Sequence, residues 1–329
     1  MSIDGKLLAR AKAAHDAMRR HNEELYERRL ERVYARAPLV RTLDVEIRAT
    51  MSELVNAALS QAGNEKIEEI RRKNLELQEE RRVQLMMAGL PEEYVEDGYM
   101  CDICRDTGFN GVEPCDCLME LYIEEQKKSL SSLFKLGNET FDSFDLLFYD
   151  DSLDPDTGVS PRRSMEIIYE TCVEYARKFN MKSMNLFFNG APGLGKTFLS
   201  ACIARVVAEN GFSVVYDMAS SIFAQFEEVK FSRSDDTEDA RSEVKRYLEC
   251  DLLILDDLGT EMTTSFTVSA LYELINTRLI TNKKTIVNSN LTMGELNKRY
   301  SMQIMSRFEG EYQVLTFRGD DIRKKRNVI

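Results

Sequence analysis

Histidine is nearly absent from this chain of 329 residues, which contains only His15 and His21. Both lie in the amino-terminal segment, so acid–base catalysis by histidine is not expected. Imidazole is a common nitrogen ligand for zinc, and it is scarce here. A metal site in this protein therefore has to be built almost entirely from thiolates.

Long apolar runs are absent too, since no stretch reaches the roughly 18 consecutive apolar residues of a transmembrane helix. The amino terminus leads into a charged amphipathic segment without the apolar region of a secretory signal. We therefore expect a cytoplasmic protein without a membrane partner. A net charge of −12 argues against coating DNA through bulk charge, while a local basic groove remains compatible with it.

The first 90 residues predict helices over about 1–36, 43–62 and 65–88, separated by Pro38 and by Gly63. Their apolar stripes are narrow and their other faces are charged. One interpretation is a self-contained helical bundle. We favour the other, that residues 1–90 form a partner-binding region that docks on a second helical surface.

Four of the seven cysteines cluster in the pattern C-x2-C-x10-C-x-C, namely Cys101, Cys104, Cys115 and Cys117. Four soft ligands at this spacing fit a closed, tetrahedral and therefore structural Zn²⁺ site. Alternatives are an iron–sulfur cluster or reduced thiols. We expect a zinc module and a linker helix over 91–134. The remaining three cysteines lie in apolar surroundings and are expected to be buried thiols.

A phosphate-binding P-loop stands between a strand-like apolar run, 185–189, and a helical pattern, 198–210. Its eight residues are Gly190, Ala191, Pro192, Gly193, Leu194, Gly195, Lys196 and Thr197. Backbone N–H groups of such a loop cradle phosphate oxygens, and the following helix adds its dipole. Lys196 is expected to reach the β- and γ-phosphates of ATP, and Thr197 to bind Mg²⁺.

From residue 185 the pattern alternates between strand and helix, which predicts an α/β fold with a parallel sheet covered by helices on both faces. Five strands are expected, over 185–189, 213–216, 252–255, 284–288 and 312–317. The third is fully apolar and delivers Asp256 and Asp257 at its carboxyl end, where ligands lie in open sheets. Asp256 is expected to hold Mg²⁺, and Asp257 to orient the attacking water.

These motifs together resemble an AAA+ ATPase, and more closely the helicase loaders of the DnaC/DnaI type and the IstB-like transposition ATPases. The resemblance covers residues 135–329 and also rests on three later segments, Val287–Asn290, Met305–Phe308 and Gly319–Arg323. The cysteine module preceded by helices is similar, more loosely, to the amino-terminal part of many loader-like proteins. The family resemblance implies a P-loop AAA+ core over 135–329 that lacks a full lid domain.

The resemblance also implies roles for single residues. Asn290 matches sensor 1, and a turn-capping asparagine is the alternative. Arg307 matches the arginine finger that enters a neighbouring subunit's site, and a surface arginine in a salt bridge is the alternative. Arg323 matches sensor 2, or else belongs to a solvated basic tail. Phe141 and Phe144 match the segment near the base, though core packing explains them equally well.

Three further features bear on the resemblance. Asp257 stands where most AAA+ proteins have glutamate, so slow hydrolysis is expected. The sequence ends at Ile329, about a dozen residues past the last strand, which leaves no room for a lid. Residues 219–249 match an extra helical element that lines the path of single-stranded DNA in this clade. Their aromatic side chains suit base stacking or a core-facing helix equally well.

The favoured function is an ATP-dependent helicase loader that binds a replicative DnaB-type helicase and assists its loading on single-stranded DNA. ATP would bridge the subunits of an oligomer, and hydrolysis would drive release. An IstB-like transposition helper shares the same core and is the near alternative. An ATP-switched adaptor with little turnover and a P-loop small-molecule kinase are alternatives from other classes.

Overall fold

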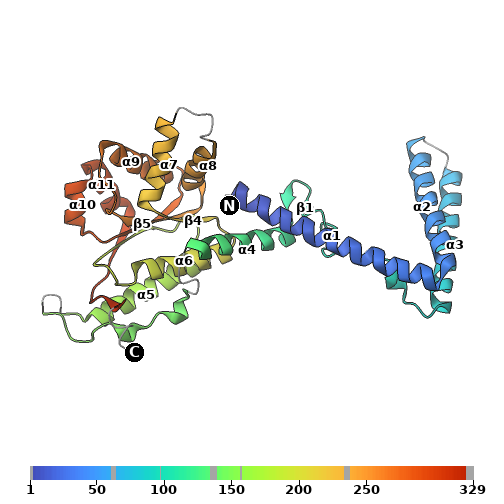
Figure 1. The fold of residues 1–329 in the computed structure, drawn as a ribbon, viewed down its shortest axis with the longest axis horizontal. Helices are drawn as coiled ribbons and strands as arrows, with labels where there is room; N and C mark the ends of the chain where they lie inside the picture. Colours follow the sequence, from blue (N-terminus) through green and yellow to red (C-terminus); the bar gives the residue numbers. More distant parts are fainter. Residues whose placement is uncertain are drawn as a thin grey trace. The chain divides into compact units, whose positions relative to one another are not determined.

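The computed structural model describes residues 3–60, 64–96, 98–133, 139–155, 158–232 and 238–323. The chain divides into two compact units. One comprises residues 12–118, and the other comprises residues 1–11 together with 119–329. Figure 1 labels the α-helices of both and some of their strands. The functional division predicted at residues 90 and 134 stays a prediction.

The smaller unit contains most of a long helix, a helical hairpin and a short two-stranded ribbon. In order these are α1 (Gly5–Arg36), α2 (Pro38–Leu59), α3 (Asn64–Met87), η1 (Glu92–Tyr94), β1 (Phe109–Asn110) and β2 (Glu113–Pro114). The three predicted helices are confirmed, although α2 begins before residue 43. Pro38 occupies its first turn, where the missing N–H breaks no hydrogen bond.

The helical hairpin of α2 and α3 is tied by polar contacts and has a small core. Asn74 of α3 donates to Thr50 of α2 at 2.6 Å, and Arg81 pairs with Asp44 at 3.0 Å. The apolar cluster at its base consists of Val33, Ala37, Val40, Leu85 and Val95. A core of this size leaves many apolar side chains of the hairpin exposed.

The larger unit has a parallel sheet of five strands. After α4 (Asp116–Leu133) and two short 3-10 turns, η2 (Phe141–Ser143) and η3 (Leu146–Phe148), helices and strands alternate. They are α5 (Pro161–Arg177), β3 (Asn185–Asn189), α6 (Lys196–Glu209), β4 (Val214–Met218), α7 (Ala219–Phe231), α8 (Glu238–Glu249), β5 (Leu252–Leu258), α9 (Ser265–Ile280), β6 (Lys284–Ser289), α10 (Met293–Arg299), α11 (Met302–Glu311) and β7 (Tyr312–Thr316). All five predicted strands are confirmed, with ends that differ by at most three residues.

The sheet order is β4-β5-β6-β3-β7, and every neighbouring pair is parallel. Alternate residues of each strand point to opposite faces. On β3, Phe188 packs in a cluster with α5 and α6, and Phe187 packs with α7, α9 and α11. Helices therefore cover both faces, as predicted (Figure 1). This layering places the carboxyl ends of β3, β5 and β6 side by side.

Among the described residues, no helix combines the length and the apolar character that crossing a bilayer requires.

Candidate functional site

The P-loop lies between β3 and α6, as the sequence predicts. Gly190, Gly193 and Gly195 adopt φ values of 141°, 78° and 90°, which side chains other than glycine rarely tolerate. A Cβ on Gly193 would lie 1.8 Å from Asp321 Oδ1, and one on Gly190 would lie 2.5 Å from the Phe317 carbonyl oxygen. Glycine is therefore needed at these positions for the backbone conformation of the loop. At Gly190 and Gly193 it also leaves room for the segment after β7.

Lys196 is buried at the start of α6. Its ammonium donates to the carbonyl oxygens of Gly190 at 2.6 Å and Ala191 at 2.8 Å. Burial lowers the pKa of Lys196 to about 8, although the nearby carboxylates of Asp257 and Asp256 act to raise it. A bound polyphosphate adds negative charge and would raise this pKa further.

Asp256, at the carboxyl end of β5, is held by donors from four directions. Asn288 Nδ2 donates to Oδ1 at 2.8 Å, and the backbone N–H of Asp257 donates to the same oxygen at 3.0 Å. Oδ2 accepts from Thr197 Oγ1 at 3.2 Å and from the hydroxyl of Tyr216. Asp256 and Thr197 are therefore adjacent and oriented, the pair of oxygen ligands that a Mg²⁺ bound with ATP would use.

Asp257 follows in a conformation unusual for aspartate, with φ of 54°. The register between β5 and β6 shifts at this point, between Leu255 and Leu258. Burial, and then the charge of Asp256, raise the pKa of Asp257. Asn290 Nδ2 donates to Asp257 Oδ1 at 3.1 Å and counters this effect. The irregular strand end thus turns the second carboxylate away from the first and toward the nucleotide pocket.

A pocket of about 250 Å³ unites most of the predicted nucleotide site. Its lining comprises Glu139, Pro192, Gly193, Leu194, Gly195, Lys196, Thr197, Phe198, Asp257, Asn290, Ile322 and Arg323. Arg323 thus lies at the pocket. Residues 324–326, the rest of the basic tail suggested as its alternative, lie outside the described residues. The chemical roles assigned to Asn290 and Arg323 stay predictions.

The segment that precedes α5 packs directly on the P-loop. The hydroxyl of Tyr149 donates to the Leu194 carbonyl at 2.9 Å. A Cβ on Gly195 would lie 3.0 Å from that hydroxyl and 3.2 Å from the ring of Phe144. Phe144 also packs on Phe198, with ring centroids 5.6 Å apart, so its core role is observed.

Arg307 is not among the residues that line this pocket. It lies on α11, where its guanidinium contacts Tyr272 and Asn276 of α9. The structure therefore brings together every predicted catalytic residue except Arg307. A finger that acts on a neighbouring subunit has no need to reach its own pocket, and that role stays a prediction.

Sequence reasoning missed three side chains that support Asp256. Tyr216 lies on β4, Asn288 lies on β6, and Ser200 on α6 accepts from Asn288 Nδ2 at 2.8 Å. The strand end Val287–Asn290 resembles the family at Asn290, and the same four residues include Asn288. The sequence does carry a signal, because a polar side chain within a buried strand requires a hydrogen-bond partner.

Residues 219–249 form α7 and α8, which confirms a helical element there; residues 233–237, in the polar stretch between them, lie outside the described part. Phe223 and Phe226 are buried in the core, so the core-facing interpretation holds for both. Phe231, at the end of α7, is 60% exposed. It packs on Phe266, and the Lys230 ammonium lies 5.3 Å from the Phe266 ring centroid.

The four clustered cysteines meet in the smaller unit, with all four sulfurs within 4.8 Å of one another. Cys101 Sγ lies 3.7 Å from Cys115 Sγ, and Cys104 Sγ lies 3.5 Å from Cys117 Sγ. A tetrahedron with zinc–sulfur bonds of about 2.3 Å has edges of about 3.8 Å. The donor set therefore fits one tetrahedral ion, and the identity of that ion as zinc stays a prediction.

Two polar side chains surround this cysteine cluster. Asp106 is buried, and its carboxylate accepts from the backbone N–H groups of Met100 at 3.1 Å and Cys101 at 2.9 Å. His15, also buried, places Nε2 3.6 Å from Cys117 Sγ. One of the two histidines thus lies beside the cluster. The sequence alone does not predict this contact, because His15 and Cys117 are 102 positions apart.

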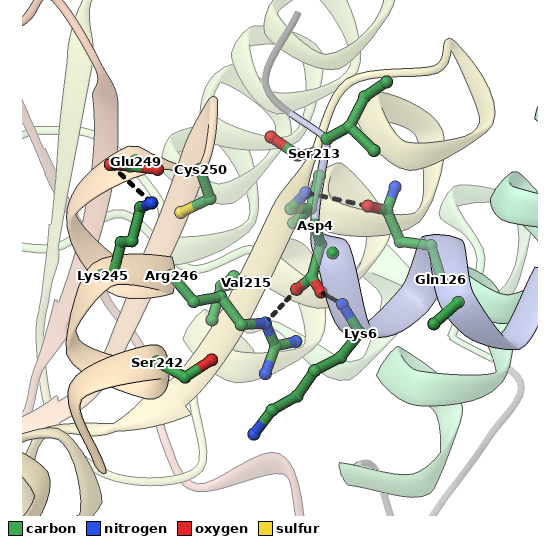
Figure 2. A pocket seen from close by; sticks show the side chains of 14 residues that line it. Asp4, Lys6, Gln126, Ser213, Val215, Ser242, Lys245, Arg246, Glu249 and Cys250 are labelled. Atoms are coloured by element: carbon green, nitrogen blue, oxygen red, sulfur yellow. Dashed lines mark hydrogen bonds and ion pairs between the residues drawn. The ribbon is translucent and has the colours of Figure 1, made fainter. Parts of the chain in front are cut away.

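A larger pocket of about 510 Å³ lies elsewhere in the same unit as the P-loop (Figure 2). The amino-terminal residues, the start of β4 and the helix α8 line it. Asp4 forms an ion pair with Arg246 of α8 at 2.5 Å, and Lys6 pairs with Glu243 at 3.0 Å. The charged side chains that line this pocket pair with one another. The pocket therefore marks where the amino terminus is attached to α8, and it is not a second nucleotide site.

Residues 173–328 match the model of the IstB-like ATP binding protein family. An insertion sequence ATP-binding protein of Sinorhizobium fredii is 30% identical over 117 residues, which cover 36% of this chain and 37% of that protein. The replicative helicase loader DnaC of Escherichia coli is 22% identical over 153 residues, which cover 46% of this chain and 61% of DnaC. Among solved structures, the DnaC helicase loader aligns with a TM-score of 0.46 and 19% identity, over 55% of this chain and 97% of that one.

The chain thus spans 37% and 61% of the length of these two curated relatives. The match to the family model covers the P-loop, both aspartates at the end of β5 and the strand end with Asn290. These residues converge on one pocket in the fold. Residues 173–328 are therefore similar to the IstB-like ATP binding proteins, and the matching motifs form one ATP site in the fold.

Proposed function

We propose that this chain is an ATP-dependent helicase loader that binds a replicative DnaB-type helicase and assists its loading on single-stranded DNA. The observation that carries the proposal is the nucleotide pocket, in which all predicted catalytic groups but one converge. Such a pocket binds ATP and Mg²⁺ within one chain. The guanidinium of Arg307 from a second chain then supplies the remaining positive charge. ATP binding then favours an oligomer, and slow hydrolysis releases it.

The partner surface in this proposal is the helical hairpin of α2 and α3. Its exposed large apolar side chains are Leu39, Val45, Met51, Val55, Leu59, Leu75, Met86 and Met87. Apolar positions on the outer faces of a helical pair suit docking on a second helical surface. Zinc in the four-cysteine cluster stabilises the fold of the unit that carries the hairpin.

A transposition helper is the second candidate, because a relative at 30% identity comes from an insertion sequence. Such a helper would use the same pocket but engage a transposase and duplex DNA. We favour the loader because a cysteine module and a helical hairpin precede the ATP-binding domain. An ATP-switched adaptor differs from both by little or no turnover.

The test is a binding experiment with the full chain and two purified candidates from its source organism, the replicative helicase and a transposase. ATP-dependent co-elution with the helicase supports the loader. Paired substitutions Met86→Glu and Met87→Glu on α3 should weaken that co-elution at least about 10-fold and leave ATP binding unchanged. Binding to the transposase and duplex DNA, with the helicase left unbound, would overturn the proposal.

A further inference from the structure

Arg307 is held in a fixed direction by α9. Its Nε and Nη2 donate to Asn276 Oδ1 at 3.1 and 2.6 Å, and Nη2 also contacts the hydroxyl of Tyr272 at 3.0 Å. The guanidinium carbon lies 4.7 Å from the centroid of the Tyr272 ring. Tyr272 and Asn276 stand one helical turn apart, so together they form a receptor for the planar guanidinium.

Every acceptor of Arg307 among the described residues is neutral. The third contact runs from Nη1 to the Gln303 carbonyl oxygen at 3.3 Å. Within the described part of the chain, Arg307 takes part in no ion pair. The alternative of a surface arginine in a salt bridge therefore lacks support. Neutral acceptors fix the direction of the group and leave its positive charge available to an anion from outside.

The same guanidinium borders a pocket of about 620 Å³ lined by the loop before β3, the end of α9 and α11. Other cations on its lining are Lys182, Lys283 and Lys284. Lys283 pairs with Asp251 at 2.9 Å, and Lys284 donates to Asn282 Oδ1 at 2.7 Å. Glu311 is the carboxylate among the described residues of this lining. The pocket thus carries a surplus of positive charge beside an oriented guanidinium.

We propose that Tyr272 and Asn276 are positioning residues, which hold Arg307 oriented and uncompensated for the triphosphate bound by a second copy of this chain. The inference rests on the proposed function, in which Arg307 completes a neighbour's site. A guanidinium that is already ordered loses little side-chain entropy when it meets the phosphate. A neutral receptor is essential here, because a carboxylate in its place would compete with the phosphate.

The decisive variant is Asn276→Asp, which keeps the shape of the side chain and adds the negative charge that the native receptor lacks. ATP turnover per chain would be measured over rising chain concentration, with Mg²⁺ and single-stranded DNA. We expect Asn276→Asp to lower the concentration-dependent turnover at least about 10-fold, a part of the effect of losing an arginine finger. Asn297→Asp, an exposed change on α10, adds the same charge elsewhere and should leave turnover unchanged.

A mixing experiment separates positioning from a structural role. Arg307→Ala chains can bind ATP but supply no guanidinium, while Lys196→Ala chains supply one but bind ATP poorly. Adding Lys196→Ala chains to Arg307→Ala chains should restore turnover. Adding Lys196→Ala chains that also carry Asn276→Asp should fail to restore it, although these chains still fold and assemble. Tyr272→Phe removes one hydrogen bond but keeps the ring, and should give a smaller loss.

The outcomes distinguish the two levels of the proposal. If Arg307→Ala retains the concentration-dependent turnover, or if turnover does not depend on chain concentration, the shared site itself is wrong. If Arg307→Ala loses turnover while Asn276→Asp and Tyr272→Phe both match the unmodified chain, the shared site stands and the positioning role is overturned. A variant that unfolds, as judged by its melting curve, is replaced by Asn276→Ser.

Discussion

At the scale of single residues, Lys196 controls how ATP binding depends on pH. Its pKa is lowered to about 8 by burial, and ATP requires the protonated form. Below pH 8 the ammonium is charged and binding needs no proton. Above pH 8 the free chain has lost that proton, so binding must take one up and the affinity falls by up to about tenfold per pH unit.

The measurement is titration of ATP into the full chain between pH 7 and pH 9.5, in two buffers that differ in ionisation enthalpy. Proton uptake should approach one per ATP at the alkaline end. Lys196→Arg is the matched control, because arginine stays protonated across this range. Equal pH dependence in both proteins would show that another group controls binding.

Tyr216 supports the second residue-scale prediction. Its hydroxyl donates to Asp256 Oδ2, the oxygen that also accepts from Thr197. Tyr216→Phe removes a hydrogen bond to a charged group, and should lower the free energy of unfolding by about 1.5–3 kcal/mol. It should also raise the Mg²⁺ concentration for half-maximal turnover, because the carboxylate is less firmly oriented beside Thr197.

Tyr247→Phe provides a comparison of the same chemistry. The hydroxyl of Tyr247 donates to Asp217 Oδ2 at 2.7 Å, in a part of the domain that does not line the nucleotide pocket. We expect a similar loss of stability with no change in Mg²⁺ dependence. A shift in Mg²⁺ dependence of equal size in both variants would remove Tyr216 from the magnesium site.

At the scale of elements, periodicity and motifs predicted the strands and the P-loop, because both are local in sequence. The missed residues depend on which strands become neighbours. β5 lies between β4 and β6, so Tyr216 and Asn288 approach Asp256 from opposite sides. Alternation of helix and strand predicts a parallel sheet but not its strand order. These contacts therefore could not be predicted from the sequence. The irregular turn at Asp257 was hidden for a similar reason, since it arises from a register shift between strands.

The start of α1 gives the prediction that belongs to this scale. Asp4 caps the helix by accepting from the backbone N–H groups of Lys6 at 2.9 Å and Leu7 at 3.1 Å, and it pairs with Arg246 (Figure 2). Asp4→Ala loses the cap, worth about 1 kcal/mol, and leaves the partly buried Arg246 with Glu243 as its remaining carboxylate partner. We expect urea unfolding to show that the free energy of unfolding falls by about 1–3 kcal/mol.

Two further variants separate these contributions. Asp4→Asn keeps a capping side chain and removes only the charge, so its loss should be the smaller one. Asp239→Ala removes the partner of Lys6 whose side chain is 95% exposed. Exposed pairs contribute little, so this change should stay within about 0.5 kcal/mol. A loss as large as that of Asp4→Ala would contradict the anchoring role of Asp4.

At the scale of the whole molecule, the cysteine cluster and the P-loop belong to different compact units. Metal binding should therefore affect the stability of the unit with the cysteines, and nucleotide binding should affect the unit with the P-loop. We predict one zinc ion per chain, lost when Cys101 or Cys115 is replaced by serine. Cys172→Ala removes a buried thiol of the other unit and should retain the full zinc content.

Removal of this metal with a strong chelator should unfold the segment around residues 99–118, because two short strands and a few turns cannot form a stable core alone. Limited proteolysis would then cut within that segment. The affinity for ATP should change less than about twofold, because Lys196, Asp256 and Asp257 all lie outside the metal-bound unit. Helicase binding would fall with the metal because the hairpin of α2 and α3 shares the unit of the cysteines. Loss of ATP affinity on chelation, with the segment still resistant to protease, would mean that the two units are not energetically separate.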